Sequence, residues 1–357
     1  MGTTADKADS AGRRSRRSRK ALLAIALLLA GLVAADRALV LWPAHWAWVA
    51  REMPVRVSDP YRVEALLRST PPSRRNVPIL GNSLAERGLD PAELERRFAA
   101  QGLRFPSITI GSGPALAFGM LANAVADLEP RAAIFVAGPL SLRSLPQLHR
   151  VRVYDLRSVP ELFSARDVLR EPGFHVAGLF GELSVVLRHG RALRNAARVR
   201  LGLGQWDQHG GGPIDARQGE YGPGSDSWLN WIREPVPDSY PNANTRALAY
   251  LSRRLRESGA RLLVIDAPVL ATPQTQSVGA RIDRYRQFLR ELSAEAGFEL
   301  LEPDPQVVYR PEDFLDGVHP SDSGRARFTA ALIESLGDRL ERDQGVEGSA
   351  GAEPVRR

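Results

Sequence analysis

The sequence predicts an α/β protein, a three-layer α/β/α sandwich built on a five-stranded parallel sheet. Short apolar runs typical of strands recur along the chain, and segments with helical periodicity separate them. Several of these runs are continuously apolar, as expected for strands buried on both faces of a parallel sheet. The predicted strands are residues 76–80, 105–110, 132–137, 261–266 and 298–302.

The helices are predicted between these strands. Asp90 and Pro91 supply a capping residue and a first-turn proline for a helix that continues through Phe98. Further helical patterns cover residues 114–129, 245–258, 280–297 and 321–340. Together they define a domain over residues 72–340.

Residues 139–244 are too long for a simple crossover, so we expect an insertion. Its first part, about residues 161–203, is predicted to be helical, and a loop rich in glycine and proline follows. That loop carries Trp206, Tyr221, Trp228 and Trp231. We expect these aromatic side chains to pin the loop to the domain, with stacking on sugar rings as the alternative.

The N-terminus has the pattern of a membrane-directed segment. Residues 1–20 form a basic tail with seven Lys or Arg residues and two Asp, and residues 21–35 are uncharged and apolar. We therefore expect residues 21–50 to be an uncleaved single-pass membrane anchor (an N-terminal transmembrane helix) that places the rest of the chain outside the cytoplasm. Trp42, Trp46 and Trp48 are interpreted as an interfacial belt. A cleaved signal is the alternative, because small residues end the run.

Charge and composition exclude several classes of site. The pI is near 10.2, but the basic tail supplies five of the seven net positive charges, so no nucleic-acid partner is predicted. The chain has no cysteine, and its six histidines show no metal-ligand spacing, so neither a metal nor another cofactor is expected.

All histidines except His319 are expected on the surface or in loops. Residues 342–357 are expected to be disordered.

One pattern of residues carries chemistry. Asp316 precedes His319 by three residues and can hold the imidazole, which leaves its other nitrogen to take a proton from a serine. Ser83 follows the first predicted strand and suits the serine's role. Turns with glycine or proline follow the next three strands, so all these pieces fall on one rim of the sheet. Ser83 has Ala85 two residues on, which excludes the nucleophile elbow of α/β-hydrolases.

These motifs resemble the SGNH (GDSL-like) hydrolase superfamily, whose sheet is flavodoxin-like. Gly81-Asn82-Ser83 and Asp316-Gly317-Val318-His319-Pro320 match its first and last blocks, and the likeness spans about residues 72–338. The resemblance implies Ser83 as nucleophile, His319 as base and Asp316 as the orienting carboxylate. It also implies an oxyanion hole made by the backbone N–H of Ser83 and that of Gly113 or Gly111.

The third block departs from the pattern. Where the superfamily has Gly-x-Asn, this chain has Gly138, Pro139 and Leu140, which leaves Ser141 or an Asn elsewhere as the candidate substitute.

The flanking sequences resemble membrane-anchored members that work beside membrane-bound O-acyltransferases on cell-envelope polysaccharide or teichoic acid. The sequence therefore predicts an outward-facing esterase or O-acyltransferase that acts on acyl esters of an envelope glycan or lipid. The alternatives are a non-catalytic binding or scaffold partner of such an acyltransferase, and a free periplasmic esterase after signal cleavage.

Overall fold

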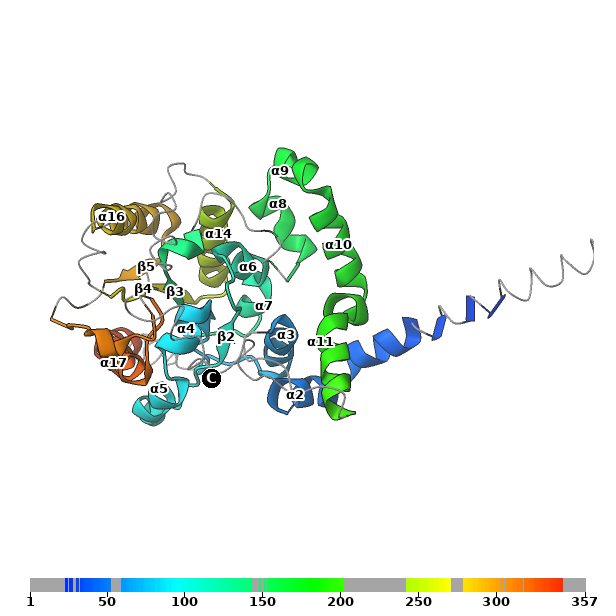
Figure 1. Cartoon of the computed structure of the whole chain (residues 1–357), viewed down its shortest axis with the longest axis horizontal. Coiled ribbons are helices and arrows are strands. Elements are labelled where there is room, and N and C mark those ends of the chain that lie inside the picture. The colour runs from blue at the N-terminus through cyan, green and yellow to red at the C-terminus, as the bar shows by residue number, and fades with distance from the viewer. Residues whose placement is uncertain are drawn as a thin grey trace, which may run out of the picture.

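The computed structural model of the chain is built on one five-stranded parallel sheet in the order β2-β1-β3-β4-β5 (Figure 1). It describes residues 33–52, 59–142, 153–201, 242–270, 279–302 and 306–342 except Gly317, together with residues 23, 24, 26, 27, 30, 31, 148, 151 and 304. The strands are β1 (Ile79–Gly81), β2 (Ser107–Thr109), β3 (Ala132–Ala137), β4 (Arg261–Asp266) and β5 (Glu299–Leu301). Each overlaps a predicted strand, although β1 begins three residues and β2 two residues later than predicted. The predicted α/β fold with a parallel sheet is therefore confirmed.

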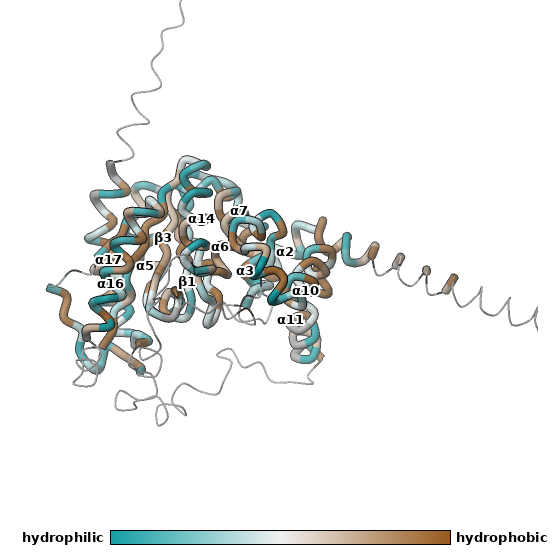
Figure 2. The backbone as a smooth tube through the Cα atoms, turned by 90° about the horizontal axis from the view of Figure 1, so that it is seen from above, coloured by the Kyte–Doolittle hydropathy of each residue, from teal (hydrophilic) through white to brown (hydrophobic). Residues whose placement is uncertain are grey.

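Helices cover both faces of the sheet. Alternate strand residues point to opposite faces, and Leu80 and Phe135 pack with α3 (Pro60–Ser69), α6 (Ala115–Met120), α7 (Ala122–Ala126), α14 (Ala243–Glu257) and α16 (Gly279–Ala296). Ile79 and Ile134 pack with the other layer, α4 (Ser83–Gly88), α5 (Pro91–Arg97) and α17 (Asp322–Arg342). Figure 2 shows β3 between α5 and α14. All six residues of β3 are buried, which explains its continuously apolar sequence.

The insertion forms a set of helices that begins against α14 and ends against α3. They are α8 (Val159–Leu162), α9 (Ala165–Arg170), α10 (Pro172–Leu183) and α11 (Val185–Arg200), which agrees with the predicted helical part of the insertion. The aromatic loop with Trp206, Tyr221, Trp228 and Trp231, and the tails at residues 1–20 and 343–357, lie outside the described residues.

The end of the expected anchor belongs to the folded domain. Helix α2 (Pro43–Arg51) packs on α3 and α11, and Trp46 and Val49 are buried there with Tyr61. The interpretation of Trp46 as an interfacial residue is wrong, because its ring is covered by Tyr61 and by the Arg68 guanidinium 4.7 Å from the ring centroid. Among the described residues, no helix is long and apolar enough to span a bilayer.

Three histidines also differ from expectation. His45, His175 and His189 are buried rather than on the surface, and each ring bonds a polar partner: Tyr61, Tyr154 and Glu64 respectively. Burial alone would raise the pKa of Glu64, but the hydrogen bond from His189 and the nearby Arg188 and Arg68 hold that pKa at about 2. Long-range partners of this kind fasten α11 to α3, and sequence spacing does not reveal them.

Gly81 is required where β1 ends. Its φ of +151° is a conformation that residues with a Cβ rarely adopt. A Cβ built there would lie 2.7 Å from Ala85 Cβ and 3.1 Å from the carbonyl oxygen of Val136. The backbone can therefore leave the buried strand and enter α4 within two residues only with glycine at this position.

Gly81→Ala is predicted to lower the free energy of unfolding by at least about 1–3 kcal/mol, because it adds backbone strain and a steric clash. The matched control is Gly337→Ala, since Gly337 lies in α17 and a Cβ added there would have nothing within 4 Å. That change should stabilise the protein slightly, as alanine is the better helix former. Chemical denaturation measures both, and equal stabilities of the two variants would contradict this account.

Candidate active site

Ser83 lies at the first position of α4, directly beyond the carboxyl end of β1. Asn82 caps the helix, with its side-chain oxygen accepting the N–H of Leu84 at 3.0 Å. Asparagine is among the preferred residues for this position. The strand, the glycine and the cap together present the Ser83 hydroxyl at the rim of the sheet, where it is only partly buried.

Asp316 and His319 lie on a closed loop before α17. Phe314 and Pro320 form an antiparallel bridge, and the N–H of Leu315 donates to the carbonyl of His319 at 2.8 Å. The Asp316 Oδ1 accepts the backbone N–H groups of Val318 and His319, at 2.8 and 2.7 Å. The carboxylate thus fixes the loop as well as the ring beside it.

The three side chains form one hydrogen-bonded chain. The distance from Ser83 Oγ to His319 Nε2 is 2.8 Å, and that from His319 Nδ1 to Asp316 Oδ2 is 2.7 Å. Ser83 and His319 are 236 residues apart in sequence. The structure therefore brings together the three side chains that the sequence singled out, with the spacing that proton transfer from the serine requires.

The charge state of Asp316 sets the direction of these bonds. Burial alone would raise the pKa of Asp316, but the side-chain and backbone hydrogen bonds from His319, the charge of its ring and the N–H of Val318 lower it below its usual range. The carboxylate is then ionised at neutral pH and can only accept. The Nδ1 of a neutral His319 therefore carries the proton, and its Nε2 is the acceptor that faces Ser83.

Packing between α4 and α17 holds the serine and the histidine in register. Phe328 of α17 lies against Gly88, where a Cβ would come within 3.0 Å of its ring. The Thr329 hydroxyl accepts the N–H of Asp90 at 3.0 Å. At the base of the loop, buried Asp313 pairs with Arg327 at 3.1 Å and accepts the N–H of Arg310. Asp313 therefore has a structural role.

The two glycines proposed for the oxyanion hole differ in their environment. The N–H of Gly113 donates to the carbonyl of Ile110 at 2.8 Å and closes a turn, so it is already engaged. Gly111 is exposed in the same turn, beside Ser112, whose φ of +56° is unusual for a residue with a side chain. The N–H of Ile110 donates to Gly81, which ties this turn to the Ser83 turn. The engagement of the Gly113 N–H leaves Gly111 as the remaining candidate donor.

Ser141 and Asn82 contact each other beside the nucleophile position. Ser141 is buried, and its Oγ accepts from Asn82 Nδ2 at 3.3 Å, while Asn82 Oδ1 holds the N–H of Leu84. The Asn82 amide is therefore used at both ends to support α4. Neither Asn82 nor Ser141 is therefore identified as the substitute for the missing third-block Asn.

Asp266 is a further carboxylate on the same rim, and the sequence did not single it out. It ends β4, is buried, and pairs with Arg286 at 2.9 Å. Burial raises the pKa of Asp266, and Arg286 offsets this only in part.

Within the described part of the chain, no three His, Cys, Asp or Glu side chains gather closely enough to hold a metal ion.

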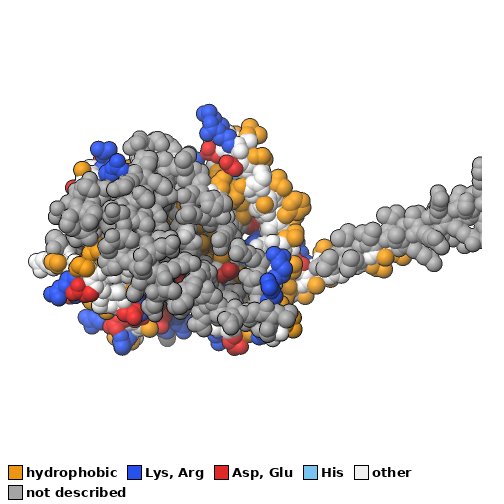
Figure 3. All heavy atoms as spheres, in the orientation of Figure 1, with side chains coloured by type: hydrophobic (Ala, Val, Ile, Leu, Met, Phe, Trp, Pro, Cys, Tyr) orange, Lys and Arg blue, Asp and Glu red, His pale blue; other side chains and the backbone are white. Residues whose placement is uncertain are grey.

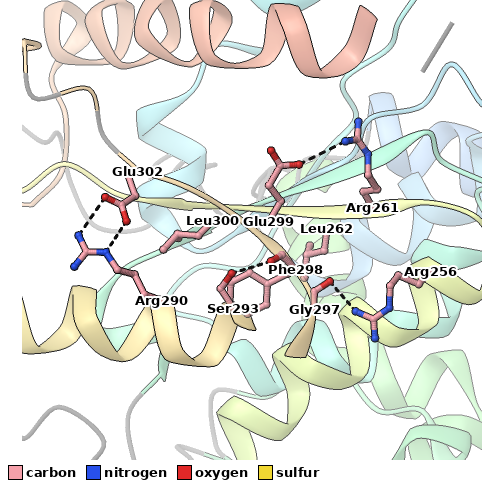
Figure 4. Close-up of a pocket in the computed structure, with 10 residues that line it drawn as sticks. All are labelled: Arg256, Arg261, Leu262, Arg290, Ser293, Gly297, Phe298, Glu299, Leu300 and Glu302. Atoms are coloured by element: carbon pink, nitrogen blue, oxygen red, sulfur yellow. Dashed lines mark hydrogen bonds and ion pairs between the residues drawn. The ribbon is translucent and has the colours of Figure 1, made fainter. Parts of the chain in front are cut away.

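A separate open hollow of about 610 Å³ lies along β5 (Figure 4). Its charged side chains bond within the protein: Arg290 to Glu302 at 2.6 Å, Arg261 to Glu299 at 3.5 Å and Arg256 to the Gly297 carbonyl at 2.7 Å. These pairs join β5 to its neighbours, so the hollow is explained as a structural groove at the edge of the sheet.

Comparisons with known proteins identify no family. No family model matches the chain, and no curated protein matches it. Solved structures that align with it include LAE5, an alpha/beta hydrolase enzyme from the metagenome of Lake Arreo, Spain, at 14% identity and a TM-score of 0.39, covering 73% of this chain and 94% of LAE5.

Two further alignments are of the same quality. TesA aligns at 13% identity and a TM-score of 0.36, covering 74% of this chain and 99% of TesA. A catalytic mutant of Axe2, an acetylxylan esterase from Geobacillus stearothermophilus, aligns at 10% identity and a TM-score of 0.39, covering 75% of this chain and 96% of its own. These scores are too low to carry a functional argument, which rests on the side-chain geometry of the site.

Asp316→Asn is predicted to reverse the tautomer of His319. An Asn Oδ1 can keep both backbone bonds, but its Nδ2 would donate to Nδ1 and leave the proton on Nε2, where it cannot accept from Ser83. Nitrogen NMR of histidine-labelled protein should show protonated Nδ1 in the wild type and protonated Nε2 in the variant. Asp322→Asn is the matched control, because the Asp322 side chain is 97% exposed. An unchanged spectrum for Asp316→Asn would refute the assignment.

Proposed function

We propose that this protein is a Ser-His-Asp ester hydrolase or O-acyltransferase. The observation that carries the proposal is the continuous chain of hydrogen bonds from Ser83 through His319 to an ionised Asp316. A serine hydroxyl is a weak nucleophile at neutral pH, and a neutral imidazole within hydrogen-bond reach is the usual means of activating it.

The proposed reaction has two halves. Ser83 Oγ attacks the ester carbonyl carbon while its proton passes to His319 Nε2, and Asp316 stabilises the imidazolium. The tetrahedral intermediate collapses when the C–O bond to the leaving alcohol breaks and His319 returns the proton to that alcohol. Water or an acceptor hydroxyl then attacks the acyl-enzyme carbonyl while its proton passes to His319 Nε2. The acyl carbon–Ser83 Oγ bond breaks as His319 returns the proton to Ser83, and the product is the free acid (hydrolysis) or the acylated acceptor (transfer).

Backbone donors would stabilise the developing oxyanion. Ser83 is the first residue of α4, where N–H groups have no partner within the helix. Its N–H and that of Gly111 lie in the two turns that the Ile110–Gly81 hydrogen bond joins. Loss of one such donor costs about a hundred- to a thousandfold in rate in other enzymes, so two donors support a slower but functional site.

The proposed substrate is an acyl ester of a cell-envelope glycan or lipid, met on the outer side of the membrane. Support comes from the basic tail followed by an apolar run at residues 21–35, and from the resemblance to membrane-anchored SGNH proteins. The second candidate is a non-catalytic scaffold for a membrane-bound O-acyltransferase. The lack of an Asn in the third block favours it, since Leu140 stands in the place of that Asn and has no side-chain donor.

Ser83→Ala separates the two candidates. The purified full chain in detergent is predicted to hydrolyse p-nitrophenyl acetate, and the variant should lose about a thousandfold or more in kcat. Ser69→Ala makes the same chemical change at the end of α3, where the hydroxyl donates to the Leu66 carbonyl of the same helix, and should leave kcat unchanged. Equal rates for wild type and Ser83→Ala would instead favour the scaffold.

A further inference from the structure

The outer surface of α10 and of the start of α11 is apolar and uncovered. Six side chains define it, here called the outer strip, and each is 43–65% exposed: Val176, Leu179, Phe180, Leu183, Val186 and Leu187. The four on α10 are spaced by three and four residues, so they share one face of the helix. Figure 3 shows hydrophobic side chains along the edge of the molecule that α10 forms in Figure 1.

The opposite face of α10 is already packed against the domain. The ring of Phe163 lies 4.8 Å from that of His175, and the Tyr154 hydroxyl bonds His175 Nδ1 at 3.2 Å. Gly178 is so close to Tyr154 that a Cβ would come within 2.2 Å of its ring. Helix α10 therefore packs on the domain with one face and leaves an apolar face uncovered, and an exposed apolar patch of this kind normally marks an interaction site.

The outer strip is continuous with the N-terminal apolar segment. Asp36 directly follows that segment and is buried, and its Oδ1 accepts the Ser184 hydroxyl and the N–H of Val186, both at 2.9 Å. Arg37 donates to the carbonyl of Leu183. These bonds fix the end of residues 21–35 at the junction of α10 and α11, within the outer strip itself.

The arrangement in space agrees. In Figures 1 and 2 the helical residues 33–41, here called the N-terminal helix, leave the domain on the side along which α10 and α11 run. In Figure 1 both helices lie crosswise to it. A plane perpendicular to the N-terminal helix would thus meet α10 and α11 along their length.

Arginines outnumber acidic residues around the outer strip, where Glu171 at the start of α10 is exposed and Glu182 is paired. Helix α11 has no acidic residue, and Arg194, Arg198 and Arg200 on it are exposed. On α9, Arg166 and Arg170 are exposed on either side of Leu169, which is 80% exposed. The one charged residue of α10, Glu182, pairs with Arg188 at 3.2 Å. Apolar side chains bordered by arginines are typical of helices that lie in the interface of anionic bilayers.

We propose that α10 and the start of α11 lie in the headgroup region of an anionic lipid bilayer, with the outer strip in contact with the acyl chains. This contact would add a second attachment to the membrane beside residues 21–35. It would also fix the rotation of the domain, and hence the direction in which the Ser83 rim faces. The proposal does not depend on the triad, so its failure leaves the proposed chemistry unaffected.

Site-specific fluorescence tests the contact, because the chain has no cysteine and single labels need no background changes. The full chain carrying Phe180→Cys, labelled with nitrobenzoxadiazole, is reconstituted into protein-free vesicles of phosphatidylglycerol and phosphatidylcholine. The expected result is a blue-shifted emission and at least twofold quenching by lipids that carry a nitroxide on the acyl chain. Leu187→Cys repeats the measurement, and circular dichroism confirms that each labelled variant is folded.

Glu295→Cys is the matched control, on an exposed position of α16 at the far side of the domain from the N-terminal helix (Figure 1). Its label should keep the emission of a dye in water and remain unquenched. The proposal is overturned if the labels at residues 180 and 187 behave like the label at residue 295. It is also overturned if the blue shift and the quenching at residues 180 and 187 are lost when the protein is diluted into excess lipid, because the outer strip would then be covered by a second copy of the chain.

Discussion

The Ser83–His319 hydrogen bond is the interaction on which the proposed function depends. Its two residues are 236 positions apart in sequence and lie on different structural elements. Ser83 is positioned by β1, by Gly81, whose backbone conformation favours glycine, and by the Asn82 cap. His319 is positioned by a loop that Asp316 and Asp313 close before α17. The contact of α17 with α4 then sets the 2.8 Å separation. Any change that moves α17 along α4 would therefore alter the distance between base and nucleophile.

Features encoded locally could be predicted from the sequence. The strands are continuous apolar runs because both faces of the sheet are covered, so β3 at Ala132–Ala137 matches its prediction residue for residue. The spacing of Asp316 and His319 within one short loop ensures that the two can meet. Parallel topology then places Ser83 on the same rim, because the carboxyl ends of all strands lie at one edge. The geometric part of the site followed from these few constraints.

Features that depend on long-range packing could not be predicted. His189 bonds Glu64 across 125 residues, and Asp36 bonds Val186 across 150, so nothing near either residue in sequence signals the partner. Trp46 follows an apolar run and has the pattern of an interfacial residue, yet Tyr61 and Arg68 of α3 cover its ring. The oxyanion donors are backbone groups, and the engagement of Gly113 with Ile110 is a property of the turn geometry. Residue types alone do not distinguish Gly111 from Gly113.

The central claim, that His319 activates Ser83 as a nucleophile, is tested most directly by covalent labelling with a fluorophosphonate. The serine oxygen would form a bond to phosphorus as fluoride leaves, and peptide mass spectrometry would locate the adduct. The account predicts one adduct, on Ser83, whose rate of formation falls by at least about a hundredfold in His319→Ala. No adduct on Ser83, or labelling that is equally fast without the imidazole, would contradict it.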